Sequence, residues 1–305
     1  MSEYFGISIE VAGLTITLFL LGYCAGPLLF APLSEFYGRR YIFYVTFLSY
    51  LGATFLCAFA PNFASLLVGR FLAGTFVSAP LTNGPGVLAD LWGPVARINA
   101  MAAFSCMVWA GPALGPVLSG FLNMTLGWRW CFYMTLWLGG ASLVFLFTIP
   151  ETYGPAVLKH KAARLRRAGF EGVRAPIEDT DRSLLAVYKV ALTRPWIILF
   201  DPISFLCAVY MSFVYLLLYM LFSMYPIIFQ EKRGWNSGVG ELPLLGTVVG
   251  AFLGAFVVVF DSRRQQRVVD SGRKLEPEDR LPLAMVGGVL FAACNFWLAW
   301  SGEFV

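Results

Sequence analysis

One arginine stands inside a long apolar stretch, where a charge needs a partner or a route to water. Arg70 is the only charged residue between positions 66 and 88. A charge in hydrocarbon is costly unless it is paired or hydrated. We therefore expect the Arg70 side chain to face the protein interior or a cavity. The alternative is an arginine whose long side chain reaches the nearby membrane surface.

A second set of charges lies beside a tight turn. The segment GPLLFAPLSEFYGRR offers only a short connection between two apolar stretches. Gly38 permits the turn, and Glu35, Arg39 and Arg40 lie next to it. Asp90 ends a later apolar stretch and, taken alone, reads as an exposed acid of little energetic weight. An ordinary basic loop is the alternative for the arginine pair.

The stretch GPALGPVLSG repeats a small residue at every fourth position. Gly111, Gly115 and Ser119 therefore share one face of the helix expected there. Small residues on one face let membrane helices approach closely, and Pro112 and Pro116 bend the helix. Ordinary close packing is the alternative.

Three tyrosines could contact an organic ligand. Tyr215 and Tyr219 are four residues apart, and Tyr210 lies nearby. Aromatic faces suit organic cations and flat molecules. Packing, or a place in the aromatic belt of a membrane protein, is the alternative.

Enzyme and metal chemistry find little support in the residue types. The six cysteines all fall inside apolar stretches without ligand or pairing spacing, and the single histidine, His160, lies in a polar segment. We expect no metal, no cofactor and no catalytic residue. Basic residues form no stripe on a soluble unit, so nucleic acid is not expected as a partner.

The elements that position these residues are membrane helices. Hydrophobic residues make up 58% of the 305 positions and charged residues 13%, against about half and a quarter in a soluble domain. The sequence predicts an all-α polytopic membrane protein. Its eight predicted spans cover 12–33, 41–60, 66–88, 98–121, 130–149, 197–228, 239–260 and 281–300. The sixth is too long for one upright helix, so it must tilt, kink or project from the bilayer.

Basic residues set the expected orientation. One set of connections carries eighteen of them and the opposite set carries Arg129, Lys232 and Arg233. The first set is therefore predicted to be cytoplasmic. The polar segment 150–195 separates an N-terminal bundle of five spans, 1–149, from a partial C-terminal bundle of three, 196–305. Within it, 155–173 reads as a basic helix, either on the anionic inner leaflet or in a solvated linker.

Several of these motifs together resemble the major facilitator superfamily. The turn PLSEFYGRR is similar to the signature between family spans two and three, with Pro32, Glu35 and Phe36 replacing its Gly, Asp and first Arg. The tetrad PETY after the fifth span, the stretch 194–227 and the segment PEDRLP at 277–282 resemble the fungal drug:proton antiporter branch. The resemblance covers nearly the whole chain.

The resemblance implies roles for individual residues. Arg70 and Gly74 match the Arg-x-x-x-Gly pattern of family span four, whose arginine is implicated in proton coupling. Glu35, Gly38, Arg39, Arg40 and Asp90 would form a cytoplasmic gate cluster that locks one conformation. The antiporter signature of family span five would comprise Gly111, Pro112, Gly115, Pro116 and Gly120.

The function implied is proton-coupled efflux of drugs, polyamines or small organic metabolites, by alternating access of two bundles to a central site. The partners would be a small organic substrate, protons and membrane lipid, and the protein would act as a monomer in the plasma membrane. A sugar or nutrient symporter of the same superfamily is the alternative, although PETY departs from the sugar-porter form. A receptor would not explain the arginine-rich turns at 39–40 and 263–264, and a polytopic enzyme would need convergent polar groups, of which the spans offer few beyond Arg70.

The topology also predicts that the chain is a fragment. Eight spans leave both termini outside, and the gate signature belongs after two family spans although one precedes it here. One span before residue 1 and three after residue 305 would restore twelve. A nonfunctional gene fragment is therefore a further alternative.

Overall fold

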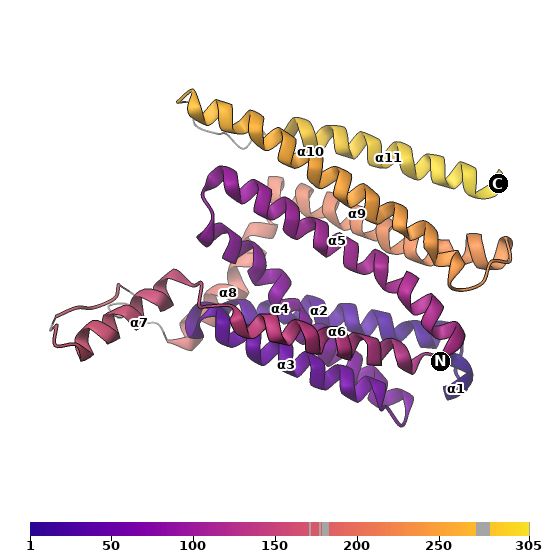
Figure 1. The fold of residues 1–305 in the computed structure, drawn as a ribbon, viewed down its shortest axis with the longest axis horizontal. Coiled ribbons are helices and arrows are strands. Elements are labelled where there is room, and N and C mark those ends of the chain that lie inside the picture. The colour runs from indigo at the N-terminus through magenta and orange to yellow at the C-terminus, as the bar shows by residue number, and fades with distance from the viewer. Residues whose placement is uncertain (171, 177, 179–182, 273–280, 305) are drawn as a thin grey trace. The chain divides into compact units, whose positions relative to one another are not determined.

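The computed structural model describes residues 1–170, 172–176, 178, 183–272 and 281–304. These residues form helices joined by short connections (Figure 1). Eight helical segments among them are long and apolar enough to cross a membrane: Ile9–Tyr37, Arg39–Ala58, Phe63–Leu91, Val95–Thr125, Arg129–Thr148, Pro202–Lys232, Val239–Val268 and Pro282–Ser301. The predicted all-α class and the eight predicted spans are confirmed. Most of the segments extend beyond the predicted bounds.

The α-helices of these segments are α2 (Ile9–Tyr37), α3 (Arg39–Ala58), α4 (Phe63–Leu91), α5 (Pro94–Thr125), α6 (Arg129–Thr148), α9 (Pro202–Tyr225), α10 (Leu245–Asp270) and α11 (Leu281–Phe304). Shorter helices are α1 (Ser2–Phe5), α7 (Gly154–Arg167) and α8 (Leu184–Leu199). A π-helical turn, Pro226–Lys232, continues α9, and a 3-10 turn, Val239–Leu244, precedes α10. An apolar helix satisfies its own backbone hydrogen bonds, which is why such stretches span a bilayer as helices.

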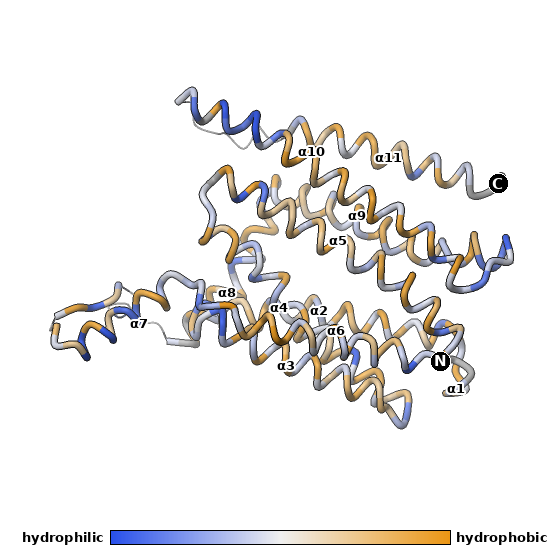
Figure 2. Tube along the Cα trace, viewed as in Figure 1, coloured by the Kyte–Doolittle hydropathy of each residue, from blue (hydrophilic) through white to orange (hydrophobic). Residues whose placement is uncertain are grey.

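Hydropathy follows this arrangement (Figure 2). The long helices are mostly apolar, whereas the end of α10 is hydrophilic and carries Arg263, Arg264 and Arg267. Helix α10 thus runs past the predicted end of its span at residue 260 to Asp270. The segment at 277–282 that contributed to the resemblance lies outside the described residues, except for its last two positions.

Contacts divide the chain into two compact units. Unit 1 comprises residues 1–91 and 121–219, and unit 2 comprises 92–120 and 220–305. The units therefore do not follow chain order, because most of α5 groups with the C-terminal helices. The predicted bundles with bounds at 149 and 196 stay a prediction.

Helices α2 and α4 form the centre of unit 1, where their backbones lie in close contact. A Cβ atom added at Gly22 or Gly26 would overlap the α4 backbone or Ser78, and one at Gly74 would overlap the backbone of Phe19. Helix α4 also packs on α3, and α3 packs on α6. A buried cluster of Cys57, Ala58, Ala60, Leu66 and Phe132 joins these helices at one end.

The predicted sixth span is wrong at its start. The helical conformation is interrupted at Phe200 and Asp201, so α8 and α9 are separate helices and the span begins at Pro202. The Asp201 carboxylate caps α9, since it accepts hydrogen bonds from the Ser204 backbone N–H and hydroxyl, both at 3.1 Å. A capping aspartate favours a helix start at this position.

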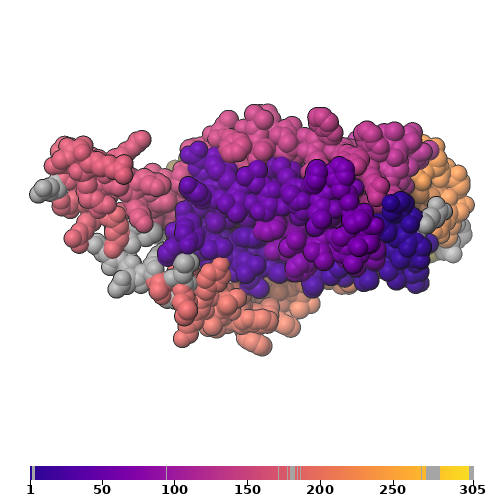
Figure 3. Space-filling view, turned by 90° about the horizontal axis from the view of Figure 1, so that it is seen from below, coloured from indigo at the N-terminus to yellow at the C-terminus, as the bar shows by residue number. Residues whose placement is uncertain are grey.

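The basic helix in the linker is α7. It projects beyond the ends of α3 and α6 within unit 1 (Figures 1 and 3), which favours the linker reading over a helix lying flat on the membrane. Arg166 clamps the following loop through two hydrogen bonds to the Glu178 carboxylate, at 2.8 and 2.9 Å. This guanidinium lowers the pKa of Glu178 to about 2.

Candidate functional site

The turn between α2 and α3 depends on Gly38. Its φ of 97° lies in the left-handed region that favours glycine. A Cβ atom at this position would also lie 2.6 Å from the Glu151 carboxylate. A residue with a side chain would therefore strain the backbone and displace the acid.

Glu151, which follows α6, caps the start of α3. Its carboxylate accepts hydrogen bonds from the backbone N–H groups of Arg39 and Arg40, at 3.2 and 3.1 Å. It also accepts the N–H groups of Thr152 and Tyr153, at 3.0 and 2.9 Å. The carboxylate thus satisfies orphan donors at the positive end of the helix dipole.

Glu151 is the acid of the PETY tetrad that contributed to the family resemblance, but the sequence did not predict it to be part of the gate cluster. A usable signal was present, because α3 begins with two arginines, no acid in its first turn and a glycine as its N-cap. A helix start of this kind lacks a local side-chain acceptor. An acid from elsewhere in the chain was therefore the natural partner.

Arg39 connects α3 to the end of α4. Its Nη1 atom lies 2.7 Å from the Asp90 Oδ2 atom, and its side chain is 12% exposed. Its guanidinium lies 5.5 Å from the centre of the Tyr153 ring. Gly86 leaves room for it, since a Cβ atom there would lie 2.9 Å from Nη2. The structure therefore brings three of the predicted gate residues together: Gly38, Arg39 and Asp90.

The side chains of the other two predicted gate residues do not join this group. Glu35 is exposed, and it forms no ion pair with a described residue. Arg40 donates through Nε to the Tyr44 hydroxyl at 2.8 Å. That hydroxyl donates in turn to the Phe147 carbonyl at 3.2 Å, which ties α3 to the end of α6.

Arg70 lies between two aromatic rings in unit 1. Its guanidinium carbon is 5.6 Å from the centre of the Phe19 ring and 5.0 Å from that of Phe132. Its Nε atom is buried without a hydrogen-bond acceptor among the described residues, and no described acid forms an ion pair with it. The aromatic faces attract the cation. The side chain therefore points into the helix packing.

An aromatic column leads from Arg70 along α2. Phe19 stacks on Tyr23, with ring centres 6.5 Å apart and an interplanar angle of 23°. The Tyr23 hydroxyl lies near those of Tyr215 and Tyr219 on α9. These two tyrosines share a helix face, whereas Tyr210 projects from a different side. Sequence reasoning missed Phe19, Tyr23 and Phe132, although Phe19 and Tyr23 carry the i, i+4 spacing of a shared face.

The glycine face of α5 is open in the structure. Added Cβ atoms at Gly111 and Gly115 would meet no atom within 4 Å, so the close helix approach expected there is not formed by the described residues. The buried stripe of α5 is instead Ala102, Cys106, Ala110, Ala113 and Val117. Gly120 is the tight position, since its Cβ atom would lie 2.5 Å from the Ser237 carbonyl oxygen. A functional role of the motif stays a prediction.

The family of the protein follows from comparison with known proteins. Residues 1–305 match the Major Facilitator Superfamily, and the chain belongs to this family. A solved structure of the human organic anion transporter MFSD10 (TETRAN) aligns with a TM-score of 0.49 and 19% identity, over 86% of this chain and 61% of that one.

Fungal efflux proteins are among its relatives. Over 97% of its length, the chain is 42% identical to "Efflux pump FUB11" of Gibberella moniliformis, of which it covers 51%. It is 41% identical, over the same share, to the major facilitator superfamily multidrug transporter mdrA of Aspergillus fumigatus, covering 50% of it. It is 40% identical to "MFS-type efflux pump MFS2" of Trichophyton rubrum, covering 51%. The chain thus spans about half the length of these relatives.

Proposed function

We propose that this protein exports small organic compounds in exchange for protons, by alternating access. The observation that carries the proposal is the buried Arg70, held between Phe19 and Phe132 and continued by the column to Tyr23. The names of the fungal relatives support export. We place the protein in the plasma membrane.

Arg70 would couple protons to transport through its charge. A desolvated cation without an acidic partner raises the free energy of any state in which a nearby group is also positive. Protonation of a group facing Arg70 in one conformation only would therefore shift the balance between conformations. Such a shift requires differential proton affinity between the two states.

Tyr23, Tyr215 and Tyr219 would supply the substrate surface. The hydroxyl groups can donate or accept hydrogen bonds, and the rings can stack on flat apolar compounds. The chemistry of these rings suits compounds with a flat apolar part. Tyr210 was predicted with this group, and its position on another side of α9 leaves it a weaker candidate.

The hydrogen-bonded group around Arg39 would make the ends of α3, α4 and α6 move together. Arg39 links to Asp90 on α4, and Glu151 links the segment after α6 to the start of α3. A rigid group at the helix ends lets unit 1 move as one body during alternating access. The predicted lock by Glu35 stays a prediction.

Transport in sealed vesicles tests the proposal. The complete reading frame that encodes this chain is reconstituted, and efflux of a panel of fluorescent organic compounds is measured with a proton gradient of either direction. We expect an inward gradient to drive efflux in the native protein and not in Arg70→Ala. Proton movement in the same direction as substrate would instead identify a symporter. Equal rates of proton-driven efflux in the native protein and in Arg70→Ala would show that Arg70 is not the coupling residue.

A further inference from the structure

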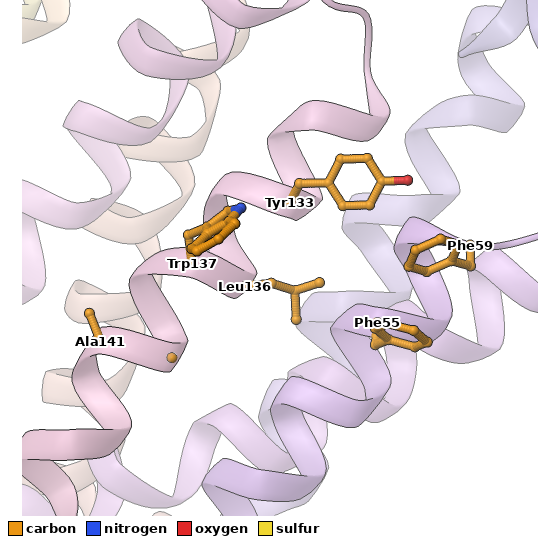
Figure 4. Close-up of a pocket in the computed structure, with 7 residues that line it drawn as sticks. Phe55, Phe59, Tyr133, Leu136, Trp137 and Ala141 are labelled. Atoms are coloured by element: carbon orange, nitrogen blue, oxygen red, sulfur yellow. The ribbon is translucent and has the colours of Figure 1, made fainter.

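An apolar groove lies between α3 and α6 in unit 1 (Figure 4), and neither Arg70 nor the tyrosines at 23, 215 and 219 line it. Its volume is about 570 Å³. The residues that line it are Phe55 and Phe59 on α3, and Tyr133, Leu136, Trp137, Gly140 and Ala141 on α6. Nothing in the proposed transport cycle uses this groove.

Large rings that line the groove are exposed. Both α3 and α6 are membrane-spanning by length and composition. Phe55 and Phe59 are each 56% exposed and Trp137 is 78% exposed, so large rings here lack protein packing on one side. Helices of this length and composition are expected to lie in a bilayer, so we seek the occupant of the groove among membrane components.

The shape of the groove suits a rigid, flat molecule. The Phe55 and Phe59 ring centres are 4.5 Å apart, and those of Phe59 and Tyr133 are 5.6 Å apart. Figure 4 shows Leu136 pointing from α6 toward these rings. Gly140 and Ala141 leave α6 almost bare at the other end, so a strip of small residues lies beside the aromatic rings.

The polar side-chain groups of the lining are the Tyr133 hydroxyl and the Trp137 indole N–H. Tyr133 lies one helical turn from the start of α6 at Arg129, close to a membrane surface. Gly140 and Ala141 lie deeper, about 12 Å from Tyr133 along the helix axis, as the rise per residue gives. The groove thus offers the Tyr133 hydroxyl and the Trp137 N–H toward the surface and apolar contacts at Gly140 and Ala141, which matches an amphiphile with a small polar head.

The charges argue against a phospholipid. None of the lining residues is charged. Arg129, at the start of α6, already donates to the Tyr4 hydroxyl at 3.1 Å and to the Ala60 carbonyl at 3.4 Å. A phosphate group binds tightly where a free cation meets it. A neutral head that needs only one hydrogen bond fits this site better.

From these observations we propose that the groove binds a sterol. The fused rings lie along Leu136, Gly140 and Ala141, flanked by Phe55, Phe59 and Trp137. The sterol hydroxyl exchanges a hydrogen bond with the Tyr133 hydroxyl. A rigid ring system loses less conformational entropy on binding than a flexible acyl chain, so shape complementarity favours it over surrounding lipid.

Photolabelling tests this site on the complete reading frame, purified in phosphatidylcholine nanodiscs. A sterol with a photoreactive group on its rings is added, and labelled peptides are mapped by mass spectrometry. We expect saturable labelling of the lining segments of α3 and α6, displaced by excess ergosterol. Labelling spread over all membrane helices, or equal labelling by photoreactive phosphatidylcholine that ergosterol does not displace, would mean a general lipid surface and overturn the proposal.

Two variants sharpen the test. A Cβ atom at Gly140 meets no atom within 4 Å, so Gly140→Leu can fill the groove without disturbing its neighbours. We expect it to weaken sterol binding about tenfold, or about 1.4 kcal/mol. Gly254→Leu on α10, where the space is equally open, is the matched control and should bind normally. Unchanged binding in Gly140→Leu would reject the site.

Tyr133→Phe keeps the ring and removes the hydroxyl. We expect it to reduce the preference for a free sterol over its methyl ether, while labelling still maps to the same helices. An unaltered preference would reject the proposed hydrogen bond. This readout does not depend on Gly140→Leu being well folded, which is checked separately by gel filtration.

Discussion

The Glu151 carboxylate accepts a hydrogen bond from the backbone N–H group of Arg39 at 3.2 Å, across 112 positions of sequence. It thereby joins the start of one membrane helix to the segment that follows another. The same arginine holds Asp90 through its side chain at 2.7 Å. Arg39 is thus the residue at which α3, α4 and the end of α6 meet.

Glu151→Gln should destabilise the protein by about 1 kcal/mol, a typical loss for a helix cap. The charge that faces the dipole of α3 disappears, and an amide must replace an acceptor for four N–H groups. Thermal unfolding in detergent measures the change. Glu35→Gln is the control, because Glu35 is exposed and unpaired among the described residues. Equal shifts in the two variants would contradict the capping role.

Arg39 and Asp90 should show a coupling energy of about 1 kcal/mol in a double-mutant cycle with alanine, near the upper end for exposed pairs. Arg39 is largely buried, while Asp90 is 43% exposed at its side chain, so solvent screens the pair in part. The coupling should fall as salt is added. A coupling energy near zero at low salt would show that this ion pair, despite its short distance, contributes nothing to the free energy of unfolding.

Arg70→Ala should abolish proton-driven transport while the protein still reaches the membrane. Arg70→Lys should recover little activity, because a lysine lacks the planar group that stacks between Phe19 and Phe132. Vesicle transport and surface abundance are measured together. Normal substrate efflux with normal proton flux in Arg70→Ala would refute the coupling role.

Gly115 and Gly120 should respond differently to leucine. Gly120→Leu should lower the stability of unit 2, since its Cβ atom would press on the Ser237 backbone. Gly115→Leu should leave stability unchanged, because the space beside it is open. The antiporter motif nevertheless predicts that Gly115→Leu blocks transport. Measuring unfolding and transport for both variants separates a packing role from a role in the transport cycle.

Basic residues predict that the Lys161 side faces the cytoplasm. Single cysteines at Lys161 and Glu231, in a cysteine-free background, are exposed to an impermeant thiol reagent in intact cells. Both positions are exposed in the structure, so access depends on the side of the membrane. We expect labelling at Glu231 only. Labelling at Lys161 alone would reverse the orientation.

The sequence alone determined the class of protein and the number of spans. Long apolar stretches satisfy their backbone hydrogen bonds only as helices in lipid, so composition and length were sufficient for this step. The motif around Gly38 also indicated the family, and the match over residues 1–305 confirmed it. The predicted start of the sixth span was wrong because the apolar residues continue through Phe200. Hydropathy therefore does not reveal the break between α8 and α9, which lies where Asp201 caps α9.

Only the tertiary structure decided which charges meet. Hydropathy places an acid near a membrane surface but does not choose its partner, since that choice depends on contacts between helices distant in sequence. Glu35 lies four positions before Arg39 in the sequence, yet Glu151 and Asp90 contact Arg39, because the turn at Gly38 directs the start of α3 toward them. The rings around Arg70 come from α2 and α6 for the same reason. Packing of remote helices, and not spacing along one of them, surrounds this charge with Phe19 and Phe132.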